Sequence, residues 1–291
     1  MGGGPMAELR PPRVEEATAI AALMSRFAPE PISEERVRRS WSAPSVDRER
    51  DARVSARSGS VVGCAALHHD TEQQAWLELH GVDVDELLDW ALETASGRRL
   101  FSGGWHQNAR VRMALEERDF ALVRHSYRMA IDLGGSAPPP DWPARIDVRT
   151  FRPDDAHAVY EAHMETFEDS WEHVREPYEE WAHWTLERPG FDPELWLLAT
   201  SGEDVAGIAL CRVHDADPET GLVAILGVRR PWRRQGLGRA LLLESFRRLA
   251  AAGCMRAILG VDASSLTGAN KLYENAGMRV VSTFDIYERR L

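Results

Sequence analysis

An internal repeat is the feature that most restricts how this 291-residue chain can fold. Each half opens with a helical pattern, at residues 14–27 in the first half and at 156–167 in the second. Each half then has a strand-like segment that contains a glycine, at residues 61–67 and 205–210, and closes with a helix end and a last strand. A duplication explains this shared order of elements better than chance does.

A segment rich in glycine and proline separates the two halves. Residues 134–143 read GGSAPPPDWP, in which the glycines interrupt regular structure and the prolines favour extended polyproline II backbone. We therefore expect a first domain at residues 8–133, a linker at 134–144 and a second domain at 145–291. Helices alternate with strands in each domain, and the early strands follow one another as in a meander. This order predicts an α+β fold on a mostly antiparallel sheet.

The composition excludes several classes of function. The chain carries 46 acidic and 35 basic residues, a formal charge of −11, which disfavours binding to nucleic acids or anionic membranes. No apolar stretch approaches the roughly 18–20 residues of a membrane span, and residues 1–6 lack the features of a signal peptide. Cys64, Cys211 and Cys254 have neither zinc-site nor disulfide spacing. We expect a reduced, cytoplasmic protein without a metal, monomeric or homodimeric.

The strongest chemical signal lies in the second half. An apolar strand at residues 222–228 leads into an arginine-rich turn and then an amphipathic helix, with Gly236 and Gly238 at the helix start. Glycine lets backbone N–H groups approach a ligand closely, and a helix N-terminus offers free donors and the positive end of the dipole. Arg233 and Arg234 add positive charge. This combination predicts an anion site, most simply for a diphosphate.

Other interpretations of this segment are possible. The glycines could serve only close packing, with the arginines on a solvated face. A nucleotide site is also conceivable, but no G-K-[ST] follows the glycines, which argues against a P-loop. A Rossmann site would need the glycines directly after a strand, whereas Pro231 and four arginines intervene here.

Residues 233–238, RRQGLG, resemble the Q/R-x-x-G-x-G/A signature of the GCN5-related N-acetyltransferase (GNAT) superfamily. Residues 261–278 resemble that family's second motif, a strand and a helix ending in L-Y-E-x-x-G-F. The tandem layout is similar to that of mycothiol synthase-like actinobacterial acetyltransferases. The resemblance implies two tandem GNAT-like domains, each a mostly antiparallel twisted sheet flanked by helices. It also implies catalysis in the second domain with acetyl-CoA or another acyl-CoA as cosubstrate.

The resemblance also implies a set of CoA-binding residues. They lie at the strand end, in the loop and in the second motif: Leu226, Gly227, Val228, Arg233, Arg234, Gln235, Gly236, Leu237, Gly238, Arg239, Ser265 and Ala269. Ser265 stands where the family usually has an asparagine. The first half departs further, because residues 80–86 are short and acidic where the glycine loop would be. Mycothiol synthase keeps a loop in both halves, so we expect a different enzyme here, with an architectural first domain.

Acyl transfer to an amine needs a proton donor, an oxyanion site and a base. The resemblance assigns the proton donor to Tyr273 and the oxyanion contact to the N–H of Val228. The glutamate that mycothiol-synthase-like enzymes use as base is replaced by Leu222. His214 and Glu219 are candidate bases, and further candidates lie near them or after the first helix of the second half: Asp215, Glu168, Asp169 and His173. Ordered water could also take the proton.

Clues to the acceptor come from one segment. Aromatic residues (Trp171, Trp181, Trp184, Phe191 and Trp196) alternate there with acidic ones (Glu172, Glu176, Glu179 and Glu180). An acidic, aromatic cleft suits a small amine, although an aromatic core with a solvated acidic face explains the pattern equally well. Protein amines are further possible acceptors. We expect an N-acyltransferase for a small amine; the alternative is an acyl-CoA-binding pseudoenzyme or scaffold without turnover.

Overall fold

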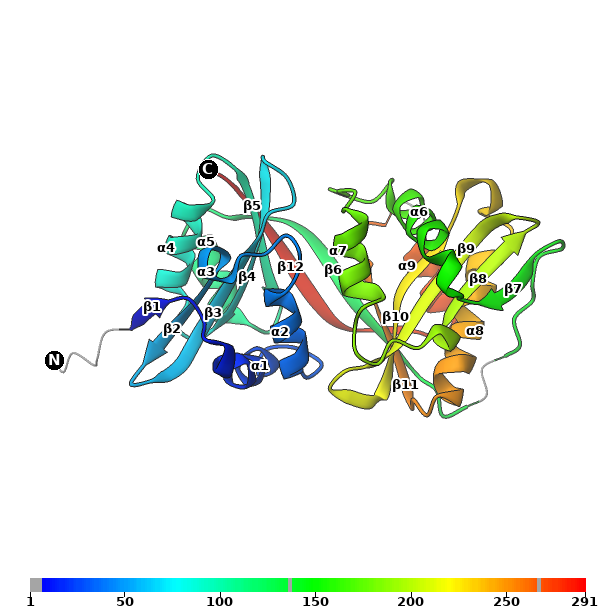
Figure 1. The fold of residues 1–291 in the computed structure, drawn as a ribbon, viewed down its shortest axis with the longest axis horizontal. Helices are drawn as coiled ribbons and strands as arrows, with labels where there is room; N and C mark the ends of the chain where they lie inside the picture. Colours follow the sequence, from blue (N-terminus) through cyan, green and yellow to red (C-terminus); the bar gives the residue numbers. More distant parts are fainter. Residues whose placement is uncertain (1–6, 136–137, 266–267) are drawn as a thin grey trace. The chain divides into compact units, whose positions relative to one another are not determined.

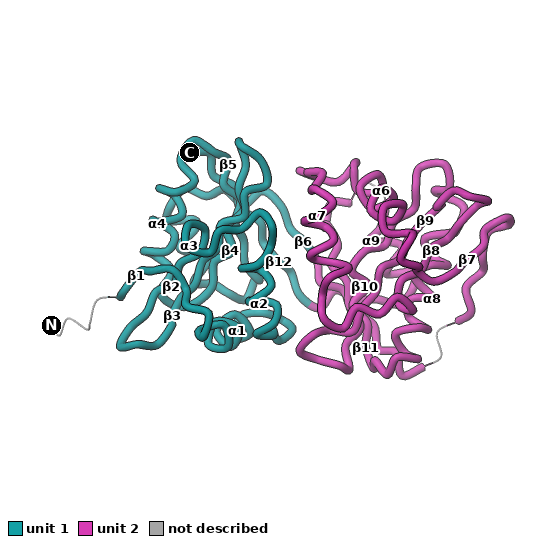
Figure 2. The backbone as a smooth tube through the Cα atoms, viewed as in Figure 1, with its two compact units in different colours: residues 1–126, 282–291 teal, residues 127–281 magenta. Residues whose placement is uncertain are grey.

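A computed structural model describes residues 7–135, 138–265 and 268–291. The described chain forms two compact units (Figures 1 and 2): unit 1 contains residues 7–126 and 282–291, and unit 2 contains residues 127–281. The chain passes from unit 1 to unit 2 inside strand β6 (Ala121–Asp132) and returns inside strand β12 (Arg279–Arg290).

Unit 1 is a mostly antiparallel sheet with helices on both faces. Its strands β1 (Glu8–Arg10), β2 (Ala52–Arg57), β3 (Ser60–His68), β4 (Gln74–Gly81) and β5 (Arg99–Trp105) lie in that order, followed by β12. Only β4 and β5 are parallel among the pairs whose register is defined. Helices α1 (Ala17–Ser25) and α2 (Glu34–Trp41) pack on one face, and α4 (Asp85–Thr94) and α5 (Ala109–Glu116) pack on the other. Short helices η1 (Val14–Glu16) and α3 (Arg48–Asp51) complete the unit.

Unit 2 repeats this plan. Strands β6, β11 (Arg256–Asp262), β10 (Asp217–Val228), β9 (Asp204–His214), β8 (Trp196–Ser201) and β7 (Asp147–Thr150) form its sheet in that order. Helices α6 (Ala156–Phe167) and α7 (Tyr178–Thr185) cover one face, and α8 (Leu237–Ala251) packs on the other, with α9 (Ala269–Asn275) in the same core cluster. Three short 3₁₀ helices lie at Pro153–Asp155, Pro193–Leu195 and Arg230–Trp232. The predicted α+β class with mostly antiparallel sheets is confirmed.

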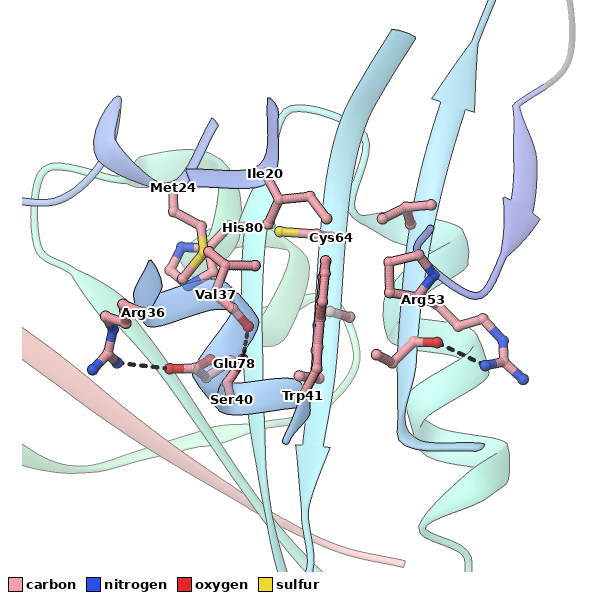
Figure 3. Close-up of a pocket in the computed structure, with 15 residues that line it drawn as sticks. Ile20, Met24, Arg36, Val37, Ser40, Trp41, Arg53, Cys64, Glu78 and His80 are labelled. Atoms are coloured by element: carbon pink, nitrogen blue, oxygen red, sulfur yellow. Dashed lines mark hydrogen bonds and ion pairs between the residues drawn. The ribbon is translucent and has the colours of Figure 1, made fainter. Parts of the chain in front are cut away.

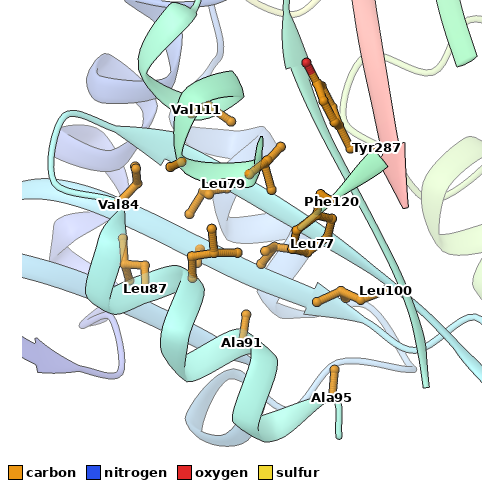
Figure 4. Packing of buried hydrophobic residues seen from close by; sticks show 14 of the residues in the cluster. Leu77, Leu79, Val84, Leu87, Ala91, Ala95, Leu100, Val111, Phe120 and Tyr287 are labelled. Atoms are coloured by element: carbon orange, nitrogen blue, oxygen red, sulfur yellow. The ribbon is translucent and has the colours of Figure 1, made fainter. Parts of the chain in front are cut away.

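The two units do not follow the linear boundaries 8–133, 134–144 and 145–291 that we expected. Residues 282–291 belong to unit 1, where β12 pairs antiparallel with β5 from Phe284↔Trp105 to Arg290↔Arg99. Tyr287 of this strand is buried with Phe120 and Leu77 in the core of unit 1 (Figure 4), and its hydroxyl donates to Glu116 at 2.8 Å. The alternation of apolar and polar residues predicts that residues 279–290 form a strand. It does not indicate which of two similar sheets that strand joins.

Three features complete the description. Residues 136 and 137 of the expected linker lie outside the described residues. No helix in the described ranges is long and apolar enough to cross a membrane. Cys64, Cys211 and Cys254 are all buried free thiols.

Candidate active site in unit 2

Strand β10 separates from its neighbour β11 along its last residues. The two strands pair in parallel only where Thr220–Leu222 face Arg256–Ile258, whereas β10 remains paired with β9 as far as Val228. A register shift between Val223 and Ile225 makes Ala224 an extra residue, a β-bulge that bends the strand locally. The edge of β10 that faces β11 is therefore unpaired from residue 223 to residue 228.

The peptide groups of Val228 face this unpaired edge. The N–H of Arg229 donates to the carbonyl of Ala206 on β9 at 3.0 Å. Because the hydrogen-bonding direction alternates along an antiparallel strand, the N–H and C=O of Val228 point away from β9. The Val228 carbonyl accepts a 2.9 Å hydrogen bond from Nε of Arg233. The Val228 N–H is thus a backbone donor at the opening between β10 and β11.

The helix that follows β10 begins with an open cradle of backbone amides. Gly236 caps α8 with a φ of +87°, and the first α-helical hydrogen bond runs from the N–H of Ala240 to the carbonyl of Gly236 at 3.1 Å. The N–H groups of Leu237, Gly238 and Arg239 therefore have no acceptor within the helix. A Cβ added at Gly236 would have no atom within 4 Å, so this surface faces open space. Free donors at the positive end of a 15-residue helix suit an anion.

Helix α6 packs directly on the end of β10. A Cβ at Gly227 would lie 2.4 Å from Oγ1 of Thr166, which explains why this position is glycine. Three arginines of the turn after β10 then bind the end of α6. Arg229 pairs with Glu165 at 2.6 Å, and Arg230 and Arg233 both pair with Asp169, at 2.7 and 3.0 Å.

These contacts give Arg233 a structural role in addition to the predicted contact with a diphosphate. Its guanidinium also donates to the carbonyl of Thr166 at 3.4 Å, so it holds α6 and β10 together. The hydrogen bonds from Arg230 and Arg233 lower the pKa of Asp169, which therefore stays ionised. Direct contact between Arg233 and a diphosphate remains a prediction, but its protein partners indicate a structural role.

Three other cations lie near the cradle without a partner. In the part of the chain that the structure describes, the side chains of Arg234, Arg239 and Lys271 are exposed and have no ion pair or hydrogen bond. Lys271 precedes Leu272, whose side chain would lie 3.5 Å from a Cβ placed on Gly238. Lys271 is the only lysine in the chain, and the sequence analysis did not select it. Gln235 instead donates to the carbonyl of Pro231 at 3.1 Å.

The second motif lies beside the cradle. Tyr273 on α9 is 8% exposed, and burial raises its pKa to about 12, so the phenol is protonated at neutral pH. Ala269 is the first residue of α9. The N–H of Ser265 donates to the carbonyl of Asp262, the last residue of β11, at 3.2 Å. Residues 266 and 267 of this motif lie outside the described residues.

Two of the predicted bases lie far from this opening. His214 and Glu219 flank the β9–β10 hairpin, at the opposite end of β10 from Val228. Glu219 precedes Val228 by nine residues, which is about 30 Å along a strand. Asp215 in the same turn pairs with Arg188 and Arg212. The chain turns from β9 into β10 at these residues. They are therefore close to β10 in sequence but lie at its start, whereas the opening beside Val228 is at its end.

The segment between α6 and α7 contains titratable groups with shifted pKa values. Burial, with the neighbouring charge of Glu180, raises the pKa of Glu176 to about 7, and burial lowers the pKa of His173. Glu168 pairs with Arg230 at 3.1 Å. From the sequence, Glu176 is only one of several acidic residues near the aromatic ones, because burial of a carboxyl group in a loop has no sequence signal.

The aromatic segment divides between core and cavity. Trp181 and Trp196 are buried at 0% and 4% exposure, and they pack in the core under α6 and α7. Trp184 and Phe191 line a cavity beside the β10 bulge at Ala224, and Trp196 also reaches its wall. Residues of β9 and α7 complete the lining, together with Arg188 and Asp192. The prediction of an aromatic wall therefore remains for Trp184, Phe191 and Trp196.

Among the described residues of unit 1, no corresponding cradle follows β4. Three residues join β4 to α4, whereas eight join β10 to α8. A Cβ on Gly63 would lie 2.4 Å from the carbonyl oxygen of Asp83, so this link folds tightly over β3. The first turn of α4 carries Asp85 and Glu86, which would repel an anion.

Comparisons with known proteins agree with this description. Residues 156–278 match the acetyltransferase (GNAT) family. The chain is 31% identical to a mycothiol acetyltransferase of Streptomyces bingchenggensis over 79% of this chain and 78% of the relative. It is 28% identical to that of Streptomyces coelicolor, over 94% and 90% of the two chains. Two solved structures have a similar fold. A GCN5-related N-acetyltransferase from Sphaerobacter thermophilus has a TM-score of 0.79 and 28% identity, covering 99% of this chain and 96% of that one. A tandem GNAT protein from the clavulanic acid biosynthesis pathway has a TM-score of 0.77 and 16% identity, covering 97% of this chain and 98% of that one.

Proposed function

The chain belongs to the GNAT family of acetyltransferases, and from this premise we propose that unit 2 transfers an acetyl or similar acyl group from acyl-CoA to a small amine. The observation that carries the proposal is the amide cradle at Gly236 beside the unpaired edge of β10 at Val228. An anionic, extended ligand could bind its diphosphate on the cradle and its arm along that edge. Acyl-CoA has this form, and it would supply the activated thioester.

The residues at the cradle fit this cosubstrate. The N–H groups of Leu237, Gly238 and Arg239 would bind the diphosphate, and Arg234 and Lys271 would add the charge that anchors it. Leu226 and Val228 at the open edge would orient the arm through their peptide groups. The acidic link in unit 1 supports a single site per chain.

We assign the chemical steps to three groups. The N–H of Val228 would stabilise the negative charge that develops on the carbonyl oxygen during attack. Glu176, with a pKa of about 7, would take the proton of the amine at neutral pH. Tyr273 stays protonated and would donate to the departing sulfur. Leu222 cannot contribute a proton acceptor, which is why a base outside β10 is needed.

The acceptor would bind on the α6–α7 side of β10. The cavity beside the bulge is lined by Trp184 and Phe191, and Glu180 lies on the same helix as Trp184. The aromatic wall favours a cationic or apolar group, and Glu180, which accepts a 2.9 Å hydrogen bond from Trp184, lies beside it. Relatives named mycothiol acetyltransferases make mycothiol-related amines the first acceptors to test, alongside amino sugars and amino acid derivatives.

Calorimetric titration with acetyl-CoA, followed by an assay of CoA thiol release with these amines, tests the proposal. We expect one binding site per chain and amine-dependent release of thiol. Two sites would refute the assignment of unit 1, and no binding would refute the proposal itself. Binding without release for every amine would favour the alternative, an acyl-CoA-binding protein without turnover, which Leu222 in place of a glutamate supports.

The charges at the cradle can be tested separately. Arg234→Ala removes a cation without a protein partner, so we expect acetyl-CoA affinity to fall about tenfold, with a weaker dependence on salt. Arg247→Ala, in the C-terminal part of α8, is a matched control, because it removes the same charge from an exposed position. Equal affinities in the two variants would remove Arg234 from the site.

A further inference from the structure

Unit 1 contains a cavity of its own, between α1, α2 and strands β2 to β4 (Figure 3). It holds about 470 Å³ of space, including its mouth. Its apolar wall consists of side chains that are at most 8% exposed: Ile20, Met24, Val37, Val54 and Cys64. Trp41 of α2 forms an aromatic side. The apolar wall of this partly open hollow suits the apolar part of a ligand.

One carboxylate faces this apolar space. Glu78 and His80 alternate along β4, so both point to the α1–α2 face of the sheet. Glu78 contacts Arg36 at 3.5 Å and His68 at 3.7 Å, and its side chain is 30% exposed. Charge-assisted hydrogen bonds are about 2.7–2.9 Å long. The carboxylate therefore has two distant partners and spare acceptor capacity.

The charge state of these groups follows from their surroundings. Burial alone would raise the pKa of Glu78, but His68 and Arg36 outweigh it, and the pKa lies well below its ordinary value. Burial lowers the pKa of His80, so its ring is neutral at neutral pH. Among the described residues, none forms a hydrogen bond with the His80 ring. The cavity thus presents the Glu78 carboxylate and the neutral His80 ring beside two cations, Arg36 and Arg53, which also line it.

We propose that this cavity binds a small primary ammonium ion with an apolar body. An ammonium group could approach Glu78 more closely than Arg36 does, while its carbon skeleton fills the space along Trp41 and Ile20. Arg36 can turn into solvent when displaced, because its side chain is already 44% exposed.

The neighbouring cation Arg53 does not compete for the carboxylate. Its guanidinium donates to the carbonyls of Glu49 and Ala52, at 2.8 and 2.7 Å, and lies 5.0 Å from the ring centre of Trp90. The cavity is also a binding site and not a second place of reaction. The link between β4 and α4 forms no glycine cradle. Burial raises the pKa of the Cys64 thiol to about 12, so the thiol is not a nucleophile.

Three phenylalkyl probes of different charge test the proposal by calorimetry on the full chain: 2-phenylethylamine, 2-phenylethanol and 3-phenylpropanoate. We expect the amine to bind about tenfold more tightly than the alcohol, and the carboxylate not to bind. Glu78→Gln should lower affinity for the amine about tenfold while changing that for the alcohol less than about threefold. Glu72→Gln, an exposed change in the preceding turn, should alter neither.

A second variant keeps the test valid if Glu78→Gln does not fold. Ala66 on β3 lines the cavity beside its register partner Glu78 on β4, and Ala66→Leu would fill space there without a change in charge. Both the amine and the alcohol should then lose about tenfold or more in affinity. No binding of the amine at millimolar concentration, or amine affinity unchanged by Ala66→Leu, would overturn the proposal. Binding that Glu78→Gln leaves unchanged in a folded protein would overturn the role of the carboxylate.

Discussion

Replacing Gly236 by alanine tests the amide cradle with little disturbance to the rest of unit 2. A Cβ at this position would have no atom within 4 Å, so the substitution creates no clash inside the protein. Its cost comes from the φ of +87°, a left-handed conformation that costs alanine roughly 1–2 kcal/mol. We expect a loss of stability near the lower limit, seen as a melting temperature lower by roughly 2–4 °C.

The effect on binding should be much larger. The added methyl group would project into the space where the diphosphate is proposed to lie. Hydrogen bonds from amides to a charged group contribute about 1.5–3 kcal/mol each. Losing two of them would weaken acetyl-CoA binding by at least about 100-fold, since 1.4 kcal/mol corresponds to about tenfold. Calorimetry with acetyl-CoA measures this directly.

Gly253→Ala is the matched control. Gly253 follows the opposite end of α8, has a φ of +94°, and would likewise have no atom within 4 Å of an added Cβ. It should lose similar stability and bind acetyl-CoA as the unmodified chain does. If Gly236→Ala binds within about threefold of the unmodified chain, the start of α8 is not the diphosphate site. If both variants lose affinity equally, the loss reflects stability and not the cradle.

Three further predictions concern the same unit. Tyr273→Phe should lower turnover about tenfold or more in steady-state kinetics, while calorimetry should show nearly unchanged affinity for acetyl-CoA. Equal turnover in the variant and the unmodified chain would exclude the hydroxyl from the mechanism. Gly227→Ala should lower the free energy of unfolding by about 1–3 kcal/mol in urea titrations, because its Cβ would overlap Thr166, and Thr166→Ala should restore part of the loss. In the unmodified chain, kcat/KM should rise with pH through about 7 as Glu176 ionises, and Glu176→Gln should flatten that profile.

The raised pKa of Glu176 also has a consequence for stability. The folded state holds this proton to about pH 7, whereas the unfolded chain releases it near its ordinary value of 4.5. The folded state therefore binds more protons between these values, and stability from this group declines as pH rises from about 4.5 to 7. Urea titrations across this range should show a shallower decline in Glu176→Gln.

Local patterns predicted the elements that depend on neighbouring residues. The helix expected at residues 156–167 is α6, Ala156–Phe167, because its apolar positions recur with helical spacing. The expected strand 222–228 is the second part of β10, and the glycine pair lies at the start of α8. Glycine at φ +87° and free amides at a helix start are properties of a short segment, so they can be inferred without the rest of the fold.

The tertiary structure decided what depends on residues distant in sequence. Arg233 and Arg234 are equivalent in the sequence, yet only Arg233 meets Asp169, because α6 packs on the end of β10. The burial that gives Glu176 a pKa of about 7 comes from its surroundings in the folded unit. β12 pairs with β5 of unit 1, where Tyr287 is buried in the core. The alternation of apolar and polar residues in β12 would fit either of the two similar sheets. The sequence by itself determined the repeat, the α+β class and the cradle; only packing between distant segments determined which charges are free and which sheet each strand completes.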